Sequence, residues 1–121
     1  MTPTILGLCL LAKRTNTDQE YTKPYNTMLI GACTITLYLP SVHSLKEKRS
    51  IVKSLIARMR NQFNIAAAEV DAQDVHTRAI IGIACVSSSG EYARGQIDAV
   101  LRWIEQERPD IPISDYEIEI L

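Results

Sequence analysis

Apolar and polar residues alternate along the stretch from Leu29 to Leu39. One set of alternate positions holds Leu29, Gly31, Cys33, Ile35, Leu37 and Leu39, and the other holds Ala32, Thr34, Thr36 and Tyr38. A period of two with β-branched residues is typical of a strand that buries one face. Pro40 is expected to end this strand, because proline has no backbone N–H to donate.

A helical pattern follows this strand. Ser44 and Glu47 have the spacing of a capping box, which predicts the start of a helix. Apolar residues then recur at helical spacing, at Leu45, Val52, Leu55, Ile56, Met59 and Phe63. This pattern predicts one amphipathic helix that runs to about Asn61.

The second half of the domain continues with strands and a helix. Strands are predicted at 63–71 and 79–87, with the polar loop 72–78 between them. Ser88 and Glu91 have capping-box spacing, and the helix that follows is expected to bury Ala93, Ile97, Val100, Leu101 and Ile104. Residues 115–121 alternate acidic with apolar side chains and predict a last strand.

The order strand, helix, strand, strand, helix, strand belongs to the α+β class. With right-handed crossovers it predicts a ferredoxin-like βαββαβ fold, a four-stranded antiparallel sheet with both helices on one face. We assign residues 28–121 to this one domain. The second face of the sheet is expected to be open.

Residues 1–27 show no such period. Their apolar run, Ile5–Ala12, is far shorter than the ~20 residues that span a bilayer, and no basic residues precede it as in a signal peptide. We expect a poorly ordered N-terminal extension, with Met28 as an alternative start of translation. The chain is expected to be cytoplasmic and to have no membrane partner.

Composition and charge refine this picture. A chain of 121 residues with 46% hydrophobic and 22% charged residues has the composition of one globular domain. The net charge of −1 conceals an uneven distribution, because residues 44–62 carry six basic residues and one acid, whereas residues 91–121 carry eight acids and three arginines. Cys9, Cys33 and Cys85 lack metal-ligand spacing, so free thiols are expected and zinc is not.

Two segments point to a known family. VHSLKEKR at Val42–Arg49 and AEVDAQD at Ala68–Asp74, with an IGIACVSS strand and a closing EIEIL, resemble the YlxP-like family, a bacterial group that carries a domain of unknown function. The resemblance covers residues 28–121 and implies a ferredoxin-like fold in a small cytoplasmic protein. Genes of this family often lie beside those for a translation initiation factor and ribosome-binding factor A, which implies a role in ribosome assembly or translation. The motif residues without an assigned role are His43, Ser44, Glu47, Asp71, Gln73 and Asp74.

The first predicted helix carries the candidate RNA contacts, which are Lys46, Lys48, Arg49, Lys53, Arg58 and Arg60. Four of these, Lys46, Arg49, Lys53 and Arg60, fall within an arc of about 60° on a helical wheel, beside the apolar stripe. A row of cations without an intervening acid suits a phosphate backbone. The alternative is a solvated face whose long side chains cover the edge of the core.

The open face of the sheet is a second candidate surface. Sheets that bind RNA stack bases on aromatic residues, and the first strand offers only Tyr38 for this purpose. Acids at Asp115, Glu117 and Glu119 would repel phosphate if they lie on the same face. The small, apolar and threonine-rich side chains of the first strand suit packing against a second copy of the chain, which predicts a homodimer.

The central loop and the first turn hold groups that can act in catalysis. Asp71, Asp74 and His76 lie close together in sequence, and His43 precedes Ser44. Carboxylates and imidazoles bind metals and transfer protons, but short polar side chains also form turns by bonding to nearby amides. Because the chain has no phosphate-binding glycine motif, no nucleophile motif and no HExxH, we expect neither catalysis nor a metal or cofactor.

Three functions follow in order of preference. The first is an accessory protein that binds RNA or a ribosomal particle through the basic helix. The second is a dimeric protein–protein interaction module without nucleic-acid contact. The third is an enzyme or small-ligand-binding protein that uses His43, Asp71 and Asp74.

Overall fold

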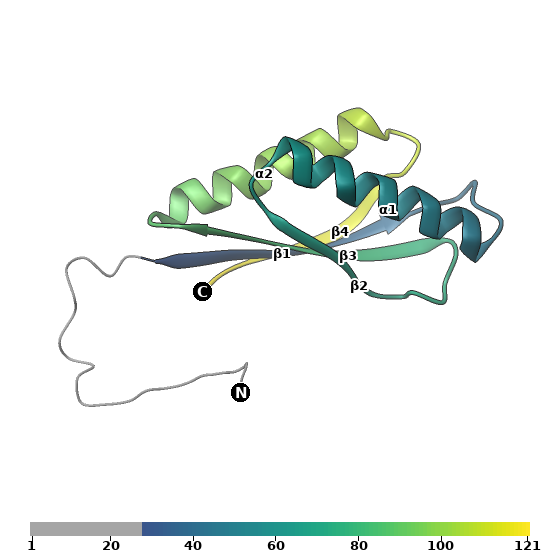
Figure 1. The fold of residues 1–121 in the computed structure, drawn as a ribbon, viewed down its shortest axis with the longest axis horizontal. Helices are drawn as coiled ribbons and strands as arrows, with labels where there is room; N and C mark the ends of the chain where they lie inside the picture. Colours follow the sequence, from purple (N-terminus) through teal and green to yellow (C-terminus); the bar gives the residue numbers. More distant parts are fainter. Residues whose placement is uncertain (1–27) are drawn as a thin grey trace, which may run out of the picture.

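The computed structural model describes residues 28–121, in which two helices cover one face of a single sheet (Figure 1). The elements follow in the order β1 (Leu29–Tyr38), α1 (Leu45–Gln62), β2 (Ala66–Asp71), β3 (Arg78–Ser87), α2 (Gly90–Glu107) and β4 (Ile113–Ile120). All neighbouring strands are antiparallel, in the order β2-β3-β1-β4. The predicted ferredoxin-like α+β fold is therefore confirmed. The extension expected over residues 1–27 lies outside the described residues.

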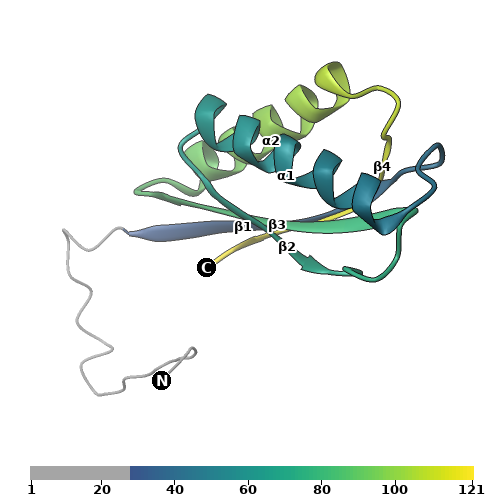
Figure 2. The same ribbon diagram turned by 45° about the vertical axis from the view of Figure 1, so that its right-hand side comes forward.

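The core lies between the sheet and the two helices, which remain on the same side of the sheet in Figure 2. The alternation predicted for β1 is confirmed, because Cys33, Ile35 and Leu37 are buried beneath the helices while Thr34 and Tyr38 are exposed. β3 contributes Ala79, Ile81, Ile83 and Cys85, α1 contributes Val52, Leu55, Ile56 and Met59, and α2 contributes Ala93, Ile97, Val100, Leu101 and Ile104. Burial of each aliphatic side chain of the size of valine or larger stabilises the folded state by about 1.5–3 kcal/mol. The apolar faces of the strands and of the helices are therefore stabilised by packing against each other in one core.

The helix starts confirm one predicted cap and correct the other. Ser44 Oγ accepts the N–H of Glu47 at 3.1 Å, and Glu47 Oε1 accepts the N–H of His43 at 3.1 Å. In α2 the cap is Ser89, whose Oγ accepts the N–H of Tyr92 at 3.3 Å. The predicted box at Ser88 and Glu91 is wrong by one residue. A run of three serines offers three possible caps, and the position where the helical backbone starts selects among them.

The junctions between elements also differ from the prediction. α1 ends at Gln62, and Phe63 is its C-cap, whose N–H donates to the Met59 carbonyl at 2.9 Å. Phe63 packs edge-to-face on Trp103, with ring centroids 5.9 Å apart, so the residue predicted to open β2 instead joins α1 to α2. β4 starts at Ile113, earlier than predicted, because the Pro112 carbonyl already accepts the Tyr38 N–H at 3.0 Å and draws the chain alongside β1.

Two of the three cysteines lie in the described part of the chain. Cys33 and Cys85 are buried free thiols, as expected. Burial raises the pKa of the Cys33 thiol to about 11, so this group stays protonated at neutral pH. Neither helix of residues 28–121 is long and apolar enough to cross a membrane.

Candidate nucleic-acid interface

Lys48 joins the two distinctive sequence segments in space. Its side chain is fully buried, and Nζ donates to the carbonyl oxygens of Ala72 at 2.7 Å and Arg78 at 3.2 Å. The third neighbour is Glu69 Oε2 at 2.8 Å. Glu69 Oε2 is buried, and its ion pair with Lys48 offsets part of the cost of removing the carboxylate from water. An ammonium enclosed in this way cannot reach a nucleic acid, and the expectation that Lys48 contacts RNA is corrected.

A signal for this burial was present in the sequence. Lys48 precedes Val52, Leu55 and Met59 by four, seven and eleven positions, which is the spacing of one helix face. Glu69 likewise shares its strand face with the buried Ala67. The apolar face of the helix and that of the strand thus each carry one ionisable residue. This pattern indicates that the two residues pair, because the burial of a single charge costs too much free energy of hydration.

The central loop is a strained turn. Ala72 has a φ of 60°, in the left-handed region that costs a residue with a Cβ roughly 1–2 kcal/mol. Its N–H donates to Asp71 Oδ1 at 2.7 Å, and its carbonyl accepts the Val75 N–H at 3.0 Å in addition to Lys48. Gln73 Nε2 donates to the Glu69 carbonyl at 3.4 Å. Asp71 and Gln73 therefore bond to the backbone of the turn in which they lie.

The groups considered for catalysis lie at the surface of the domain. Asp74, His76 and His43 are exposed, and the backbone of His43 takes part in the start of α1. Within residues 28–121 there is no group of three or more His, Cys, Asp or Glu side chains that could hold a metal ion.

Two further cations of α1 bind neighbouring elements. Arg58 forms an ion pair with Glu107 of α2, and its guanidinium lies 5.5 Å from the centre of the Trp103 ring. Arg60 Nη2 donates to the Ala67 carbonyl of β2 at 2.6 Å. Arg58 therefore faces α2, whereas Arg60 lies on the opposite flank of α1, next to the sheet edge formed by β2.

Three cations remain exposed on the β2 flank of the helix. Lys46, Arg49 and Lys53, here called the α1 row, form no ion pair with any other residue in the part of the chain that the structure describes. Glu47 is the one acid in α1, and its carboxylate is directed toward the His43 amide. Arg60 extends the row toward the C-terminus of the helix. The row is the candidate nucleic-acid interface.

The open face of the sheet is apolar in its middle and acidic at one side. Pairing places Asp115, Glu117 and Glu119 beside Thr36, Thr34 and Ala32, so the acidic row does share a face with these residues. A shallow depression of about 450 Å³ lies over β2, β3 and β1. Its outer lining includes Ala32, Thr34, Ala66, Ala68, Val70, Gly82 and Ala84. Small residues line this face, and among residues 28–121 no aromatic ring stands at its centre for a base to stack on.

Two comparisons with known proteins found matches for this chain. Residues 30–118 match a family model described as "Protein of unknown function (DUF503)". The chain is also similar to "Uncharacterized protein YlxP" of Bacillus subtilis (strain 168), with 35% identity over 77 residues that cover 64% of this chain and 84% of the relative. The family match includes all six elements apart from the tips of β1 and β4, and both segments joined by Lys48. The chain therefore belongs to the DUF503 family, as its resemblance to the YlxP-like group predicted.

Proposed function

We propose that the protein binds RNA through the α1 row and serves as an accessory factor in ribosome assembly or translation. The single observation that carries the proposal is the exposure of Lys46, Arg49 and Lys53 on one flank of α1 without an acidic partner among the described residues. The ribosomal context rests on the family resemblance described above.

The spacing of the row suits a phosphate backbone. Positions 46, 49 and 53 follow one another by three and four residues, so the outer two are separated by about 10 Å along the helix axis at 1.5 Å per residue. Side chains this long and flexible can each reach a separate phosphate. Because phosphate contacts carry no sequence information, we expect the row to bind RNA with little sequence preference.

The distribution of charge supports a contact on this side of the molecule. β2 and β4 are the two outer strands of the sheet. The α1 row lies toward β2, while β4 carries Asp115, Glu117 and Glu119 at the opposite side. An incoming polyanion is therefore attracted to one side of the molecule and repelled by the other, which orients its approach.

The test is filter binding of the full chain to small-subunit ribosomal RNA at three salt concentrations. About three phosphate contacts with irregular RNA give a log–log slope against salt near −2. Replacing Arg49→Gln and Lys53→Gln should weaken binding to all RNAs alike and reduce the slope by about one to two. Stability should change little, because glutamine retains a high helix propensity.

The matched control is the pair Arg94→Gln and Arg102→Gln, which removes two exposed cations from α2 instead. Binding that falls equally in both double variants would mean that net charge alone attracts RNA. Binding that is independent of salt, or indifferent to Arg49 and Lys53, would rule out the α1 row as the interface.

A second candidate function is a homodimeric interaction module, favoured by the flat depression on the open face. If two copies pack sheet against sheet about an axis parallel to the strands, the acids of one β4 lie over the small residues of the partner's β2. The acidic rows of the two copies then avoid each other.

Replacing Thr34→Lys at the middle of this face should convert the dimer to a monomer, because the contact would bury a charge. Light scattering that gives a monomer for the unmutated chain at tens of micromolar excludes this candidate.

A further inference from the structure

The outer edge of β4 presents unpaired backbone groups at defined residues. Ile30 and Leu121 exchange two backbone hydrogen bonds, of 3.1 and 2.7 Å. In an antiparallel ladder, bonded pairs alternate with non-bonded pairs. Counting back along the register, Glu119 and Glu117 bond to β1, whereas Tyr116, Ile118 and Ile120 direct their N–H and C=O groups away from it. β4 pairs with β1 and with no other strand of residues 28–121.

The two outer edges of the sheet differ in the regularity of their backbone. On β2, Arg60 bonds to the Ala67 carbonyl, and the register shifts between Glu69 and Asp71. An irregular register and an occupied backbone carbonyl of this kind blunt an edge strand. On β4 the pairing is regular from Asp115 to Ile120. Tyr116 N–H donates to Asp115 Oδ1 at 2.9 Å, and within residues 28–121 no hydrogen bond occupies the outward groups of Ile118 and Ile120.

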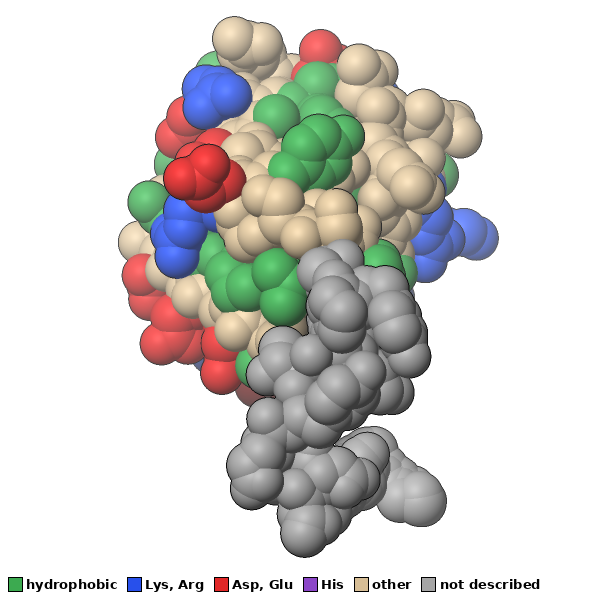
Figure 3. Space-filling model, turned by 90° about the vertical axis from the view of Figure 1, so that its left-hand side faces the viewer, with side chains coloured by type: hydrophobic (Ala, Val, Ile, Leu, Met, Phe, Trp, Pro, Cys, Tyr) green, Lys and Arg blue, Asp and Glu red, His purple; other side chains and the backbone are tan. Residues whose placement is uncertain are grey.

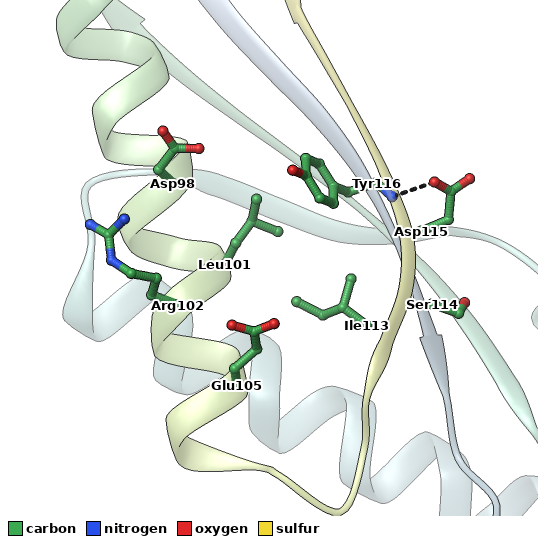
Figure 4. Close-up of a pocket in the computed structure, with 8 residues that line it drawn as sticks. All are labelled: Asp98, Leu101, Arg102, Glu105, Ile113, Ser114, Asp115 and Tyr116. Carbon is green, nitrogen blue, oxygen red and sulfur yellow. Dashed lines mark hydrogen bonds between the residues drawn. The ribbon is translucent and has the colours of Figure 1, made fainter.

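A groove of about 360 Å³ lies beside the first half of this edge, between α2 and residues 113–116 of β4 (Figure 4). Leu101 of α2 and Ile113 of β4 point toward each other across it, and the Tyr116 ring is directed to the same side. Asp98, Arg102 and Glu105 lie along the helix side of the groove. A side chain from an added strand could thus enter a space with an apolar floor and a mostly acidic rim.

The other side of the edge is strongly acidic. Asp115, Glu117 and Glu119 lie on the open face of β4, and residues 113–121 contain no lysine or arginine. In the view of Figure 3, acidic side chains gather along one flank of the molecule. A strand beside β4 would place every second side chain next to this row, and opposite charges on neighbouring strands stabilise such pairing.

We infer that the outer edge of β4 binds an extended basic peptide segment by strand addition. The ligand alternates lysine or arginine with apolar residues, so that its cations meet the acidic row and its apolar side chains enter the α2–β4 groove. A second copy of the chain is a poor occupant, because pairing β4 with β4 would bring two acidic rows together on one face. This inference concerns the side opposite the α1 row and does not depend on RNA binding.

The probe is a fluorescein-labelled, acetylated peptide that alternates lysine and valine over seven residues, titrated with the full chain and followed by anisotropy. Replacing its lysines with glutamate should abolish binding. In the protein, Glu117→Gln with Glu119→Gln should lower affinity about five-fold, from the loss of two cross-strand charge pairs. The matched control, Asp74→Asn with Glu91→Gln, removes two exposed acids elsewhere and should leave affinity unchanged.

Two N-methylated isomers of the peptide separate strand addition from charge attraction. Methylation at every valine removes the donors of one peptide edge, and methylation at every lysine removes those of the other, with charge unchanged. Strand addition predicts that one isomer binds at least about ten-fold more weakly, since several backbone hydrogen bonds are lost, while the other retains binding. Three results would overturn the inference. The two isomers could bind with equal affinity, the substitutions at Glu117 and Glu119 could leave the affinity unchanged, or the chain could self-associate and fail to bind the peptide.

Discussion

Lys48 of α1 and Glu69 of β2, which are 21 positions apart in the chain, form an ion pair of 2.8 Å beneath the first helix. The Lys48 side chain is fully buried and 15% of the Glu69 side chain is exposed, and the same ammonium also binds the carbonyls of Ala72 and Arg78. The pair therefore orders both the end of β2 and the loop that leads into β3.

Replacing Lys48→Met should lower the free energy of unfolding by about 3–5 kcal/mol, because it leaves a buried carboxylate without its counter-charge. The double variant Lys48→Met with Glu69→Leu should recover much of this loss, since no buried charge remains. Urea denaturation of both variants measures the effect. The control Lys46→Met, on the same helix but exposed, should stay within about 0.5 kcal/mol of the unmutated chain. A cost at Lys48 no larger than that control would contradict a structural role for the pair.

Ala72→Gly should stabilise the protein by about 1 kcal/mol, because glycine adopts a positive φ without the steric cost that a Cβ imposes. The control is Ala68→Gly in the middle of β2, where extended backbone makes glycine destabilising by about 0.5–1 kcal/mol. Thermal unfolding of the two variants compares them directly. A lower melting temperature for Ala72→Gly would mean that the left-handed turn is not strained.

Single substitutions should show which serine caps each helix. Ser44→Ala and Ser89→Ala should each cost about 1 kcal/mol, because each hydroxyl accepts a backbone N–H in the first turn of its helix. Ser88→Ala should cost little, since Ser88 caps nothing in the structure. Chemical denaturation of the three variants provides the measurement, and a larger loss at Ser88 than at Ser89 would restore the cap expected from the sequence.

Burial should protect Cys33 from modification. Its pKa is raised from 9.0 to about 11, so iodoacetamide at pH 8 should label Cys33 far more slowly in the folded chain than in urea. A raised thiol pKa contributes stability that is complete below pH 9 and declines as the pH rises toward 11, because the unfolded thiol ionises first. Mass spectrometry of a Cys9→Ser, Cys85→Ser chain follows Cys33 alone, and equal labelling in both states would contradict the expected protection.

The pattern of the sequence by itself determined the architecture. The alternation in β1 and the helical spacing of α1 and α2 required one buried face on each element, and six elements in this order then have few ways to share a core. The errors of the sequence-based prediction lie at the ends of the helices and strands. Phe63 fits both the end of a helix and the start of a strand, and the three residues Ser87–Ser89 offer equivalent caps, so local chemistry left these boundaries open.

Only the tertiary structure decided which charges are available for binding. Lys46 and Lys48 are the same residue type in the same basic segment, but one faces water and the other is enclosed by Glu69 and two carbonyls from the far end of β2 and the start of β3. Likewise, the exposed backbone edge of β4 depends on which strand lies in the middle of the sheet. These properties arise from contacts between segments that are distant in the sequence. The fold decides which charge finds a counter-charge and which backbone amide finds a hydrogen-bond partner.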